Sequence, residues 1–206
     1  MSFLTSSSAP CSRGEISIHR KEHSYADYCS IPYPQQPQAI TNHFSPTPTY
    51  KCHTHGNPKV LETILARHAD ADACIHLGDG EGDVKLFLSC HPEWESKFYA
   101  VRGNCDFNSS LPISRTIDLI PGHRIFAVHG HRHAIRYTPD ILVEEAIAED
   151  CNIVLHGHTH VRRNEYRNGV YLMNPGSAAQ PRDGMPPSYA YIDYEKGGIF
   201  ISHVSL

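Results

Sequence analysis

Four short apolar runs share one unusual ending, and this ending limits the possible folds more than any other feature. Each run closes on glycine combined with Asp, Asn or His: "ACIHLGD" (73–79), "FYAVRGNCD" (98–106), "IFAVHGH" (125–131) and "NIVLHGHTH" (152–160). A short apolar run that stops at glycine is typical of a strand covered on both faces. In α/β sheets ligands bind at the carboxyl ends of strands, so we expect these polar endings to gather at one edge.

Helical patterns alternate with these strands early in the chain, and hairpins follow later. Asn57 and Pro58 are typical of a helix start, and apolar residues continue at helical spacing to His68. The same kinds of pattern indicate a helix over 83–90, two strands over 116–131, a helix over 139–151, and hairpins over 162–177 and 188–204. This order predicts an α/β fold with strands on more than one sheet.

Composition argues against several classes of protein. The net charge of −4 gives no sign of a nucleic-acid-binding surface, and no run reaches the ~18 apolar residues that span a membrane. Seven Cys without a C-x-x-C pair argue against a disulfide framework and against a zinc ribbon. The N-terminus lacks the basic and apolar regions of a signal peptide, so we expect a cytoplasmic protein.

The N-terminal quarter of the chain differs from the remainder. Residues 1–50 hold six Pro and nine Ser, but one Leu and no Val. A segment so poor in aliphatic residues buries too little surface to offset the entropy lost on ordering. We therefore expect residues 1–49 to be disordered, or to come from an error in the gene model, and residues 50–206 to form one domain.

The polar strand endings make a candidate metal site. Imidazole binds transition metals near neutral pH, and sixteen His is a high count for 206 residues. Each residue alone is more often a turn or core residue, but scattered histidines would not follow four successive strands in register. The candidates, in chain order, are Asp79, Asn104, His129, His131, His158 and His160.

These endings carry a resemblance to a known family. The motifs, in order, are H-x-H-G-N (53–57), G-D (78–79), G-N-C-D (103–106), H-G-H (129–131), G-H-T-H (157–160) and N-P-G-S (174–177). In order and spacing they resemble the calcineurin-like metallophosphoesterases, most closely the small single-domain bacterial and archaeal phosphodiesterases, over about residues 51–204. The resemblance implies a four-layer sandwich of two mixed β-sheets flanked by helices. It also implies hydrolysis of a small phosphodiester or other phosphate ester by a hydroxide held between two divalent metal ions.

The resemblance further implies a ligand set. Asp79 would bridge the two ions, His55 and His160 would serve the first, and the second would take Asn104, His129 and His158. Mixed nitrogen and oxygen ligands without thiolate favour Mn, Fe, Ni or Zn, with Mn as the first choice. His131 would touch substrate or support a ligand.

Two residues depart from the wider family pattern. His53 stands where the first motif usually has Asp, which removes one negative charge and predicts weaker metal binding. Cys105 stands where larger relatives have a His that protonates the leaving group, which predicts a preference for good leaving groups. The alternative function is a non-catalytic scaffold of the same fold, like the retromer subunit that resembles these enzymes. Metal content would separate the two.

Overall fold

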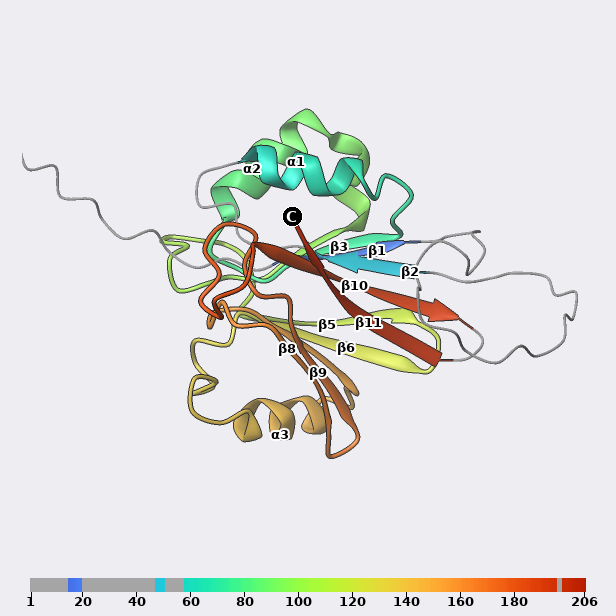
Figure 1. Ribbon diagram of the computed structural model, residues 1–206, viewed down its shortest axis with the longest axis vertical. Helices are drawn as coiled ribbons and strands as arrows, with labels where there is room; N and C mark the ends of the chain where they lie inside the picture. Colours follow the sequence, from blue (N-terminus) through green and yellow to red (C-terminus); the bar gives the residue numbers. More distant parts are fainter. Residues whose placement is uncertain (1–14, 20–46, 51–57, 196–197) are drawn as a thin grey trace, which may run out of the picture.

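Two mixed β-sheets packed face to face form the centre of the computed structural model, which describes residues 15–19, 47–50, 58–195 and 198–206 (Figure 1). The first sheet has the strand order β11-β10-β1-β3-β4, with β2 paired to β1. Its strands are β1 (Glu15–His19), β2 (Thr47–Tyr50), β3 (Ala73–His76), β4 (Phe98–Ala100), β10 (Ser188–Glu195) and β11 (Gly198–Ser205). Within it β3 and β4 run parallel, so their carboxyl ends point the same way.

The second sheet has the order β5-β6-β7-β9-β8. Its strands are β5 (Ser114–Ile120), β6 (His123–Val128), β7 (Ile153–His156), β8 (Arg163–Arg167) and β9 (Val170–Asn174). The central strands β6, β7 and β9 are parallel, whereas β5 and β8 pair antiparallel at the two edges. The parallel centre aligns the ends of β6 and β7, the strands that lead into the two histidine-rich motifs.

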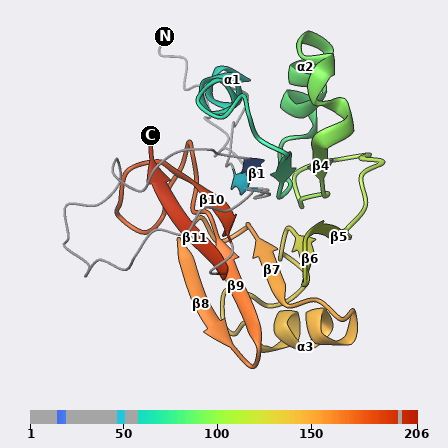
Figure 2. The same ribbon diagram turned by 90° about the vertical axis from the view of Figure 1, so that its right-hand side faces the viewer.

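Helices cover the outer faces of both sheets. These are α1 (Pro58–Ala66), α2 (Glu81–Cys90) and the 3-10 helix η2 (Pro92–Lys97) on the first sheet, and α3 (Asp140–Ala148) on the second. Figure 2 shows α1 and α2 on one side of the two sheets and α3 on the other. The resulting order of helices, sheet, sheet and helix confirms the predicted four-layer α/β sandwich.

Apolar clusters hold these layers together. The largest lies between the sheets and draws on both, with Ile75 and Ile192 from one and Ile125 and Leu155 from the other. Leu61, Phe87 and Trp94 pack the first helical layer onto β3 through Cys74. Leu142, Val143 and Ala146 of α3 pack onto Phe126, Val154 and Leu172 of the second sheet. Because β3 and β7 are buried along their whole length, their sequences show no alternation of apolar and polar residues.

The predicted elements from residue 58 onward are confirmed, with small shifts at their ends. The strongest local signal was Asn168-Gly169 between β8 and β9. Both residues have positive φ, 51° and 86°, as the favoured two-residue hairpin turn requires. Helix α2 begins at Glu81 rather than Asp83, because the chain turns into the helix directly after the Gly-Asp motif.

Two strands fall within residues 1–49 or at their border, where composition predicted disorder. Strand β1 lies inside the first sheet, parallel to β10 and antiparallel to β3, and β2 pairs with it at one position. The segment "EISIH" alternates Ile with polar residues, which is a strand pattern that the average composition of the segment conceals. Residues 1–14 and 20–46 lie outside the described residues, so disorder there stays a prediction.

Candidate metal centre

Four donor atoms from four loops meet where the carboxyl ends of β3, β4, β6 and β7 come together. The Nε2 of His129 lies 3.4 Å from Oδ2 of Asp79 and 3.1 Å from Oδ1 of Asn104. The Nδ1 of His158 lies 3.0 Å from the same amide oxygen and 3.3 Å from His129 Nε2. The structure therefore brings together four of the residues that the sequence predicted, Asp79, Asn104, His129 and His158.

Asp79 is held in place by the loop that carries Asn104. Its Oδ1 accepts the backbone N–H of Cys105 at 2.6 Å, which leaves Oδ2 directed toward His129. Its own backbone N–H donates to Oδ2 of Asp106 at 2.6 Å. The side chain of Asp79 is 1 % exposed, so these contacts fix a carboxylate that water reaches poorly.

His129 presents one nitrogen to the cluster because the other is already engaged. Its Nδ1 lies 2.6 Å from the carbonyl oxygen of Leu77, to which it donates a hydrogen bond. The lone pair of Nε2 then faces Asp79 and Asn104. Burial first, and then the charges of His158, His131 and His76, lower the pKa of His129 well below its ordinary value. The ring is consequently neutral at pH 7, the form that binds a metal.

His158 lies at the mouth of the cluster and contacts an arginine that the sequence analysis did not single out. Nε of Arg136 donates to Nε2 of His158 at 3.2 Å. Burial, Arg136, His131 and Arg182 lower the pKa of His158 to about 4, so this ring is also neutral at pH 7. No periodic pattern marks Arg136, because it lies in the irregular segment between β6 and α3.

The remaining predicted residues occupy different places. The ring centre of His131 lies 5.3 Å from that of His129 and 6.3 Å from that of His158, so it borders the four donor atoms. His160 is fully buried, and its Nδ1 donates to the carbonyl oxygen of Gln180 at 2.6 Å, which leaves Nε2 as its metal-binding nitrogen. His53 and His55 lie outside the described residues, so their predicted ligand roles stay predictions.

The backbone at this edge adopts costly conformations. Asp79, His158 and His160 have φ values of 62°, 65° and 60°, which side-chain-bearing residues rarely adopt. Gly103 permits the close approach of the two loops, because a Cβ at this position would lie 2.0 Å from Oδ1 of Asp79. Strained backbone of this kind persists where the surrounding structure enforces it, and it concentrates at functional sites.

The donor set fits a transition metal ion. Ligand atoms about 2.1 Å from one ion lie roughly 3.0–3.4 Å from each other, and the four distances given above fall in this range. Within the described residues no group of three or more His, Cys, Asp and Glu side chains forms a metal site. The converging set depends on the amide of Asn104, and it would be completed by residues beyond that part of the chain.

Cys105 departs from the sequence prediction. It is disulfide-bonded, whereas Cys74, Cys90 and Cys151 are free thiols. An odd cysteine count argued against a disulfide framework, but it does not exclude a single bond. The bonded Sγ of Cys105 carries no proton, so it cannot protonate a leaving group.

The comparisons with known proteins agree with this geometry. The sequence profile of the calcineurin-like phosphoesterase superfamily domain matches residues 52–197. The chain belongs to the calcineurin-like phosphoesterase superfamily. The family explains why glycine-ended strands deliver Asp, Asn and His to one edge in this order.

Two curated relatives and one solved structure illustrate the kinship. The probable metallophosphoesterase YsnB of Bacillus subtilis is 34 % identical over 144 residues, which are 69 % of this chain and 80 % of YsnB. Phosphodiesterase YfcE of Escherichia coli K12 is 31 % identical over 162 residues, covering 68 % of this chain and 83 % of YfcE. A crystal structure of a predicted phosphoesterase from Streptococcus pneumoniae has a TM-score of 0.63 at 27 % identity, covering 74 % of this chain and 84 % of that one.

The superfamily generally uses divalent metals, in keeping with the donor set of this chain. None of the helices formed by the described residues has the length and apolar character needed to cross a bilayer.

Proposed function

We propose that this protein is a metal-dependent phosphodiesterase. The observation that carries the proposal is the convergence of Asp79, Asn104, His129 and His158, with donor atoms 3.0–3.4 Å apart. Two neutral imidazoles, one amide oxygen and one carboxylate make a site for borderline transition metals rather than for Mg²⁺ or Ca²⁺. Membership of the superfamily and similarity to a protein named as a phosphodiesterase support the same reaction class.

The residues that would hold two ions are the converging four together with His160 and, beyond the described part, His53 and His55. Divalent ions in such a site, Mn²⁺ foremost, would polarise the phosphate and lower the pKa of water. Asp79 suits the position between two ions, because its carboxylate offers two oxygens and its orientation is fixed by Cys105 N–H. Asn104 adds a neutral oxygen beside both imidazoles.

The expected substrate preference follows from the lack of a good proton donor for the leaving group at this edge of the sheets. Cys105 is disulfide-bonded and has none to give. Burial, Arg132, His133 and Arg102 lower the pKa of His131, so at pH 7 this ring seldom carries the proton that a general acid must donate. Diesters whose leaving group departs as a stable anion are therefore favoured over alkyl phosphates.

A test combines metal analysis with hydrolysis of bis(p-nitrophenyl) phosphate. We expect the purified protein to bind about two equivalents of Mn²⁺ and to hydrolyse the diester only when metal is present. Asp79→Asn should lower kcat at least a hundredfold and leave the circular dichroism spectrum unchanged. The matched control is Asp118→Asn, on the exposed edge strand β5, which should retain wild-type activity.

The scaffold alternative is decided by the same samples. A protein that takes up no transition metal under metal-replete conditions, and does not hydrolyse the diester, would be a non-catalytic member of the superfamily. Full activity of Asp79→Asn would instead show that hydrolysis occurs without the proposed bridge.

A further inference from the structure

Four arginines surround the histidine cluster, and we refer to Arg102, Arg132, Arg136 and Arg182 as the arginine collar. They come from three separate loops, which follow β4, β6 and β9. Arg136 touches His158 directly at 3.2 Å, and the backbone N–H of Arg182 donates to the carbonyl oxygen of His160 at 3.0 Å. The positive charges of Arg102 and Arg132 act on His131, and that of Arg182 acts on His158. Arg136 therefore borders the cluster by direct contact, and the other three lie on the segments of Asn104, His131 and the loop bonded to His160.

The collar has no carboxylate partner within the described part of the chain. Three acidic side chains of the surrounding segments are each paired with another cation, namely Asp183 with Arg162 at 2.8 Å, Glu145 with His133 at 2.9 Å and Glu81 with Lys85 at 2.6 Å. The buried carboxylates of Asp79 and Asp106 instead accept backbone N–H groups. Other arginines in the fold do have such partners, for example Arg124 with Asp118. Among the described residues, these four arginines outnumber the two carboxylates of Asp79 and Asp106 at this edge, which leaves a local excess of positive charge although the net charge of the chain is −4.

This positive charge is greater than the charge needed to neutralise one diester phosphate. A diester carries a single negative charge, which the metal centre itself would neutralise. Arg132, Arg136 and Arg182 are exposed, and Arg136 reaches the outer nitrogen of His158, on the opposite side of the ring from Asn104. Guanidinium groups pair with phosphate through two parallel hydrogen bonds, so they suit a second phosphate lying outside the metal centre.

We propose that the arginine collar binds a further phosphate group of the substrate, so that the preferred substrate is a phosphodiester carrying at least one additional phosphate. This inference rests on the proposed phosphodiesterase function and specifies its substrate class. The scissile group lies at the four donor atoms, and the collar holds the second group at the rim. Arg136 and Arg182 contribute most, because Arg136 contacts His158 and the backbone of Arg182 is bonded to that of His160 in the same motif.

The test uses two substrates that differ by a single phosphate. These are thymidine 5′-(p-nitrophenyl phosphate) and the same compound bearing a 3′-phosphate, which share leaving group, nucleoside and scissile bond. We expect the 3′-phosphate to raise kcat/KM about tenfold, mainly through a lower KM. Arg136→Ala and Arg182→Ala should each reduce this ratio roughly threefold, and the double variant should abolish it. Arg67→Ala, exposed after α1, is the matched control and should keep the full ratio.

Binding to metal-free protein separates this proposal from the proposed function. Titration calorimetry with thymidine 3′,5′-bisphosphate, compared with thymidine, should show binding that the Arg136/Arg182 double variant loses. If the wild type binds the bisphosphate but hydrolyses neither diester, phosphate binding by the arginine collar is supported and the phosphodiesterase proposal is wrong. If hydrolysis proceeds without any preference for the 3′-phosphate, or the double variant keeps that preference, the collar proposal is overturned.

Discussion

The carboxylate of Asp106 ties the backbone of Asp79 to the loop that carries Asn104. Its Oδ2 accepts the N–H of Asp79 at 2.6 Å and that of Gly103 at 2.9 Å, and its Oδ1 accepts the N–H of Glu81 at 3.0 Å. Asp106 is 9 % exposed and shares a short segment with Asn104. One buried side chain thus sets the distance between the loops that carry Asp79 and Asn104.

Asp106→Ala should separate metal binding from folding. Losing three charge-assisted hydrogen bonds frees both loops, so we expect metal affinity to fall about 10–100-fold, in line with other groups that orient ligands. Asp106→Asn keeps one oxygen for the N–H groups of Asp79 and Gly103. Its metal affinity should therefore lie between that of Asp106→Ala and that of the wild type. Competition titration with a fluorescent chelator measures this order. Equal affinity in all three proteins would show that Asp106 does not position the ligands.

A methyl group at position 103 should be more damaging than one at position 82. The Cβ of Gly103→Ala would collide with the side chain and backbone of Asp79, whereas nothing lies within 4 Å of a Cβ at Gly82. We expect Gly103→Ala to cost about 1–3 kcal/mol of unfolding free energy and to lose metal. Gly82→Ala, in α2, should keep metal and gain up to about 1 kcal/mol. Urea denaturation of both variants measures the difference in their free energies of unfolding. Equal values would show that the loops move to accommodate the added methyl group at position 103.

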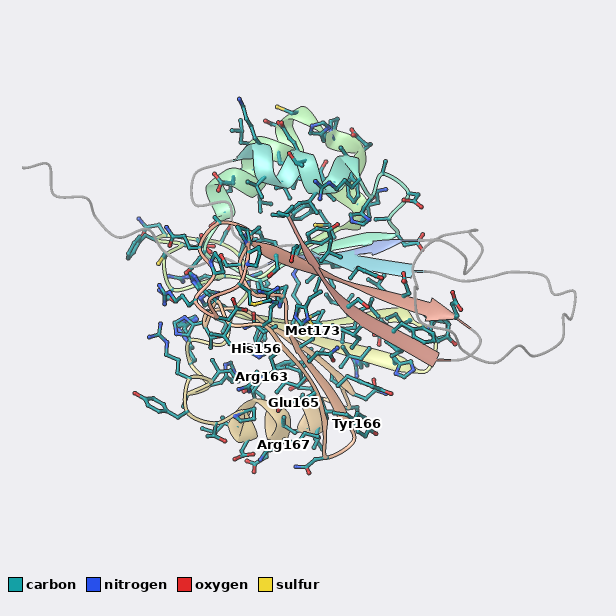
Figure 3. All side chains as sticks on the ribbon, in the orientation of Figure 1. His156, Arg163, Glu165, Tyr166, Arg167 and Met173 are labelled. Atoms are coloured by element: carbon teal, nitrogen blue, oxygen red, sulfur yellow. The ribbon has the colours of Figure 1, made fainter. Side chains whose placement is uncertain are left out.

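Stability should decline in acid partly through His156. This ring lies at the end of β7 near Arg163 (Figure 3), and it is 1 % exposed. Burial first, and then the charges of Arg163, His158 and His133, lower its pKa from 6.5 to about 3. Below pH 6.5 the unfolded chain gains a proton that the folded chain does not take up until about pH 3. Stability is therefore complete above pH 6.5 and is lost as pH falls toward 3.

The variant His156→Asn isolates this contribution. Its amide oxygen can replace Nδ1 as acceptor for Asn174 Nδ2, which lies 3.1 Å away in the wild type, but it does not titrate. Between pH 7 and pH 4 the metal-free wild type should lose on the order of 3 kcal/mol more than the variant. Urea midpoints across this range provide the measurement, and parallel curves would rule out His156 as the source.

Strand β1 leads to a further prediction, which reverses the one drawn from composition. Composition predicts disorder for residues 1–49, yet Ser17 of β1 lies between Tyr191 of β10 and Cys74 of β3. Ser17→Pro removes an N–H from the middle of a sheet, so we expect a loss of about 3 kcal/mol or more. Ser17→Ala keeps the N–H and is the control. Thermal midpoints that agree within error would mean that β1 contributes nothing to stability.

Features that depend on a few neighbouring residues could be predicted from the sequence. The glycine-ended strands predict that Asp79, Asn104, His129 and His158 lie together, because an apolar run and its terminal glycine lie within a few residues. Arg136 could not be found, since its contact with His158 depends on the course of an irregular loop. The positive φ of Asp79 and His158 was equally hidden, because packing imposes it against local preference. Strand β1 was missed because an average over fifty residues outweighed a five-residue pattern.

The last prediction concerns the charge of the metal centre. His53 stands where the resemblance to the superfamily implies Asp, and the described candidate ligands include one carboxylate, Asp79, which would face the four positive charges of two divalent ions. His53→Asp adds a negative charge and a second carboxylate, so we expect metal affinity to rise about tenfold and activity to rise with it. His53→Asn supplies an oxygen without the charge and separates the two effects. Competition with a chelator should show the highest metal affinity for His53→Asp, an intermediate affinity for the wild type and the lowest affinity for His53→Asn. An affinity that does not change with either substitution would place position 53 outside the metal centre.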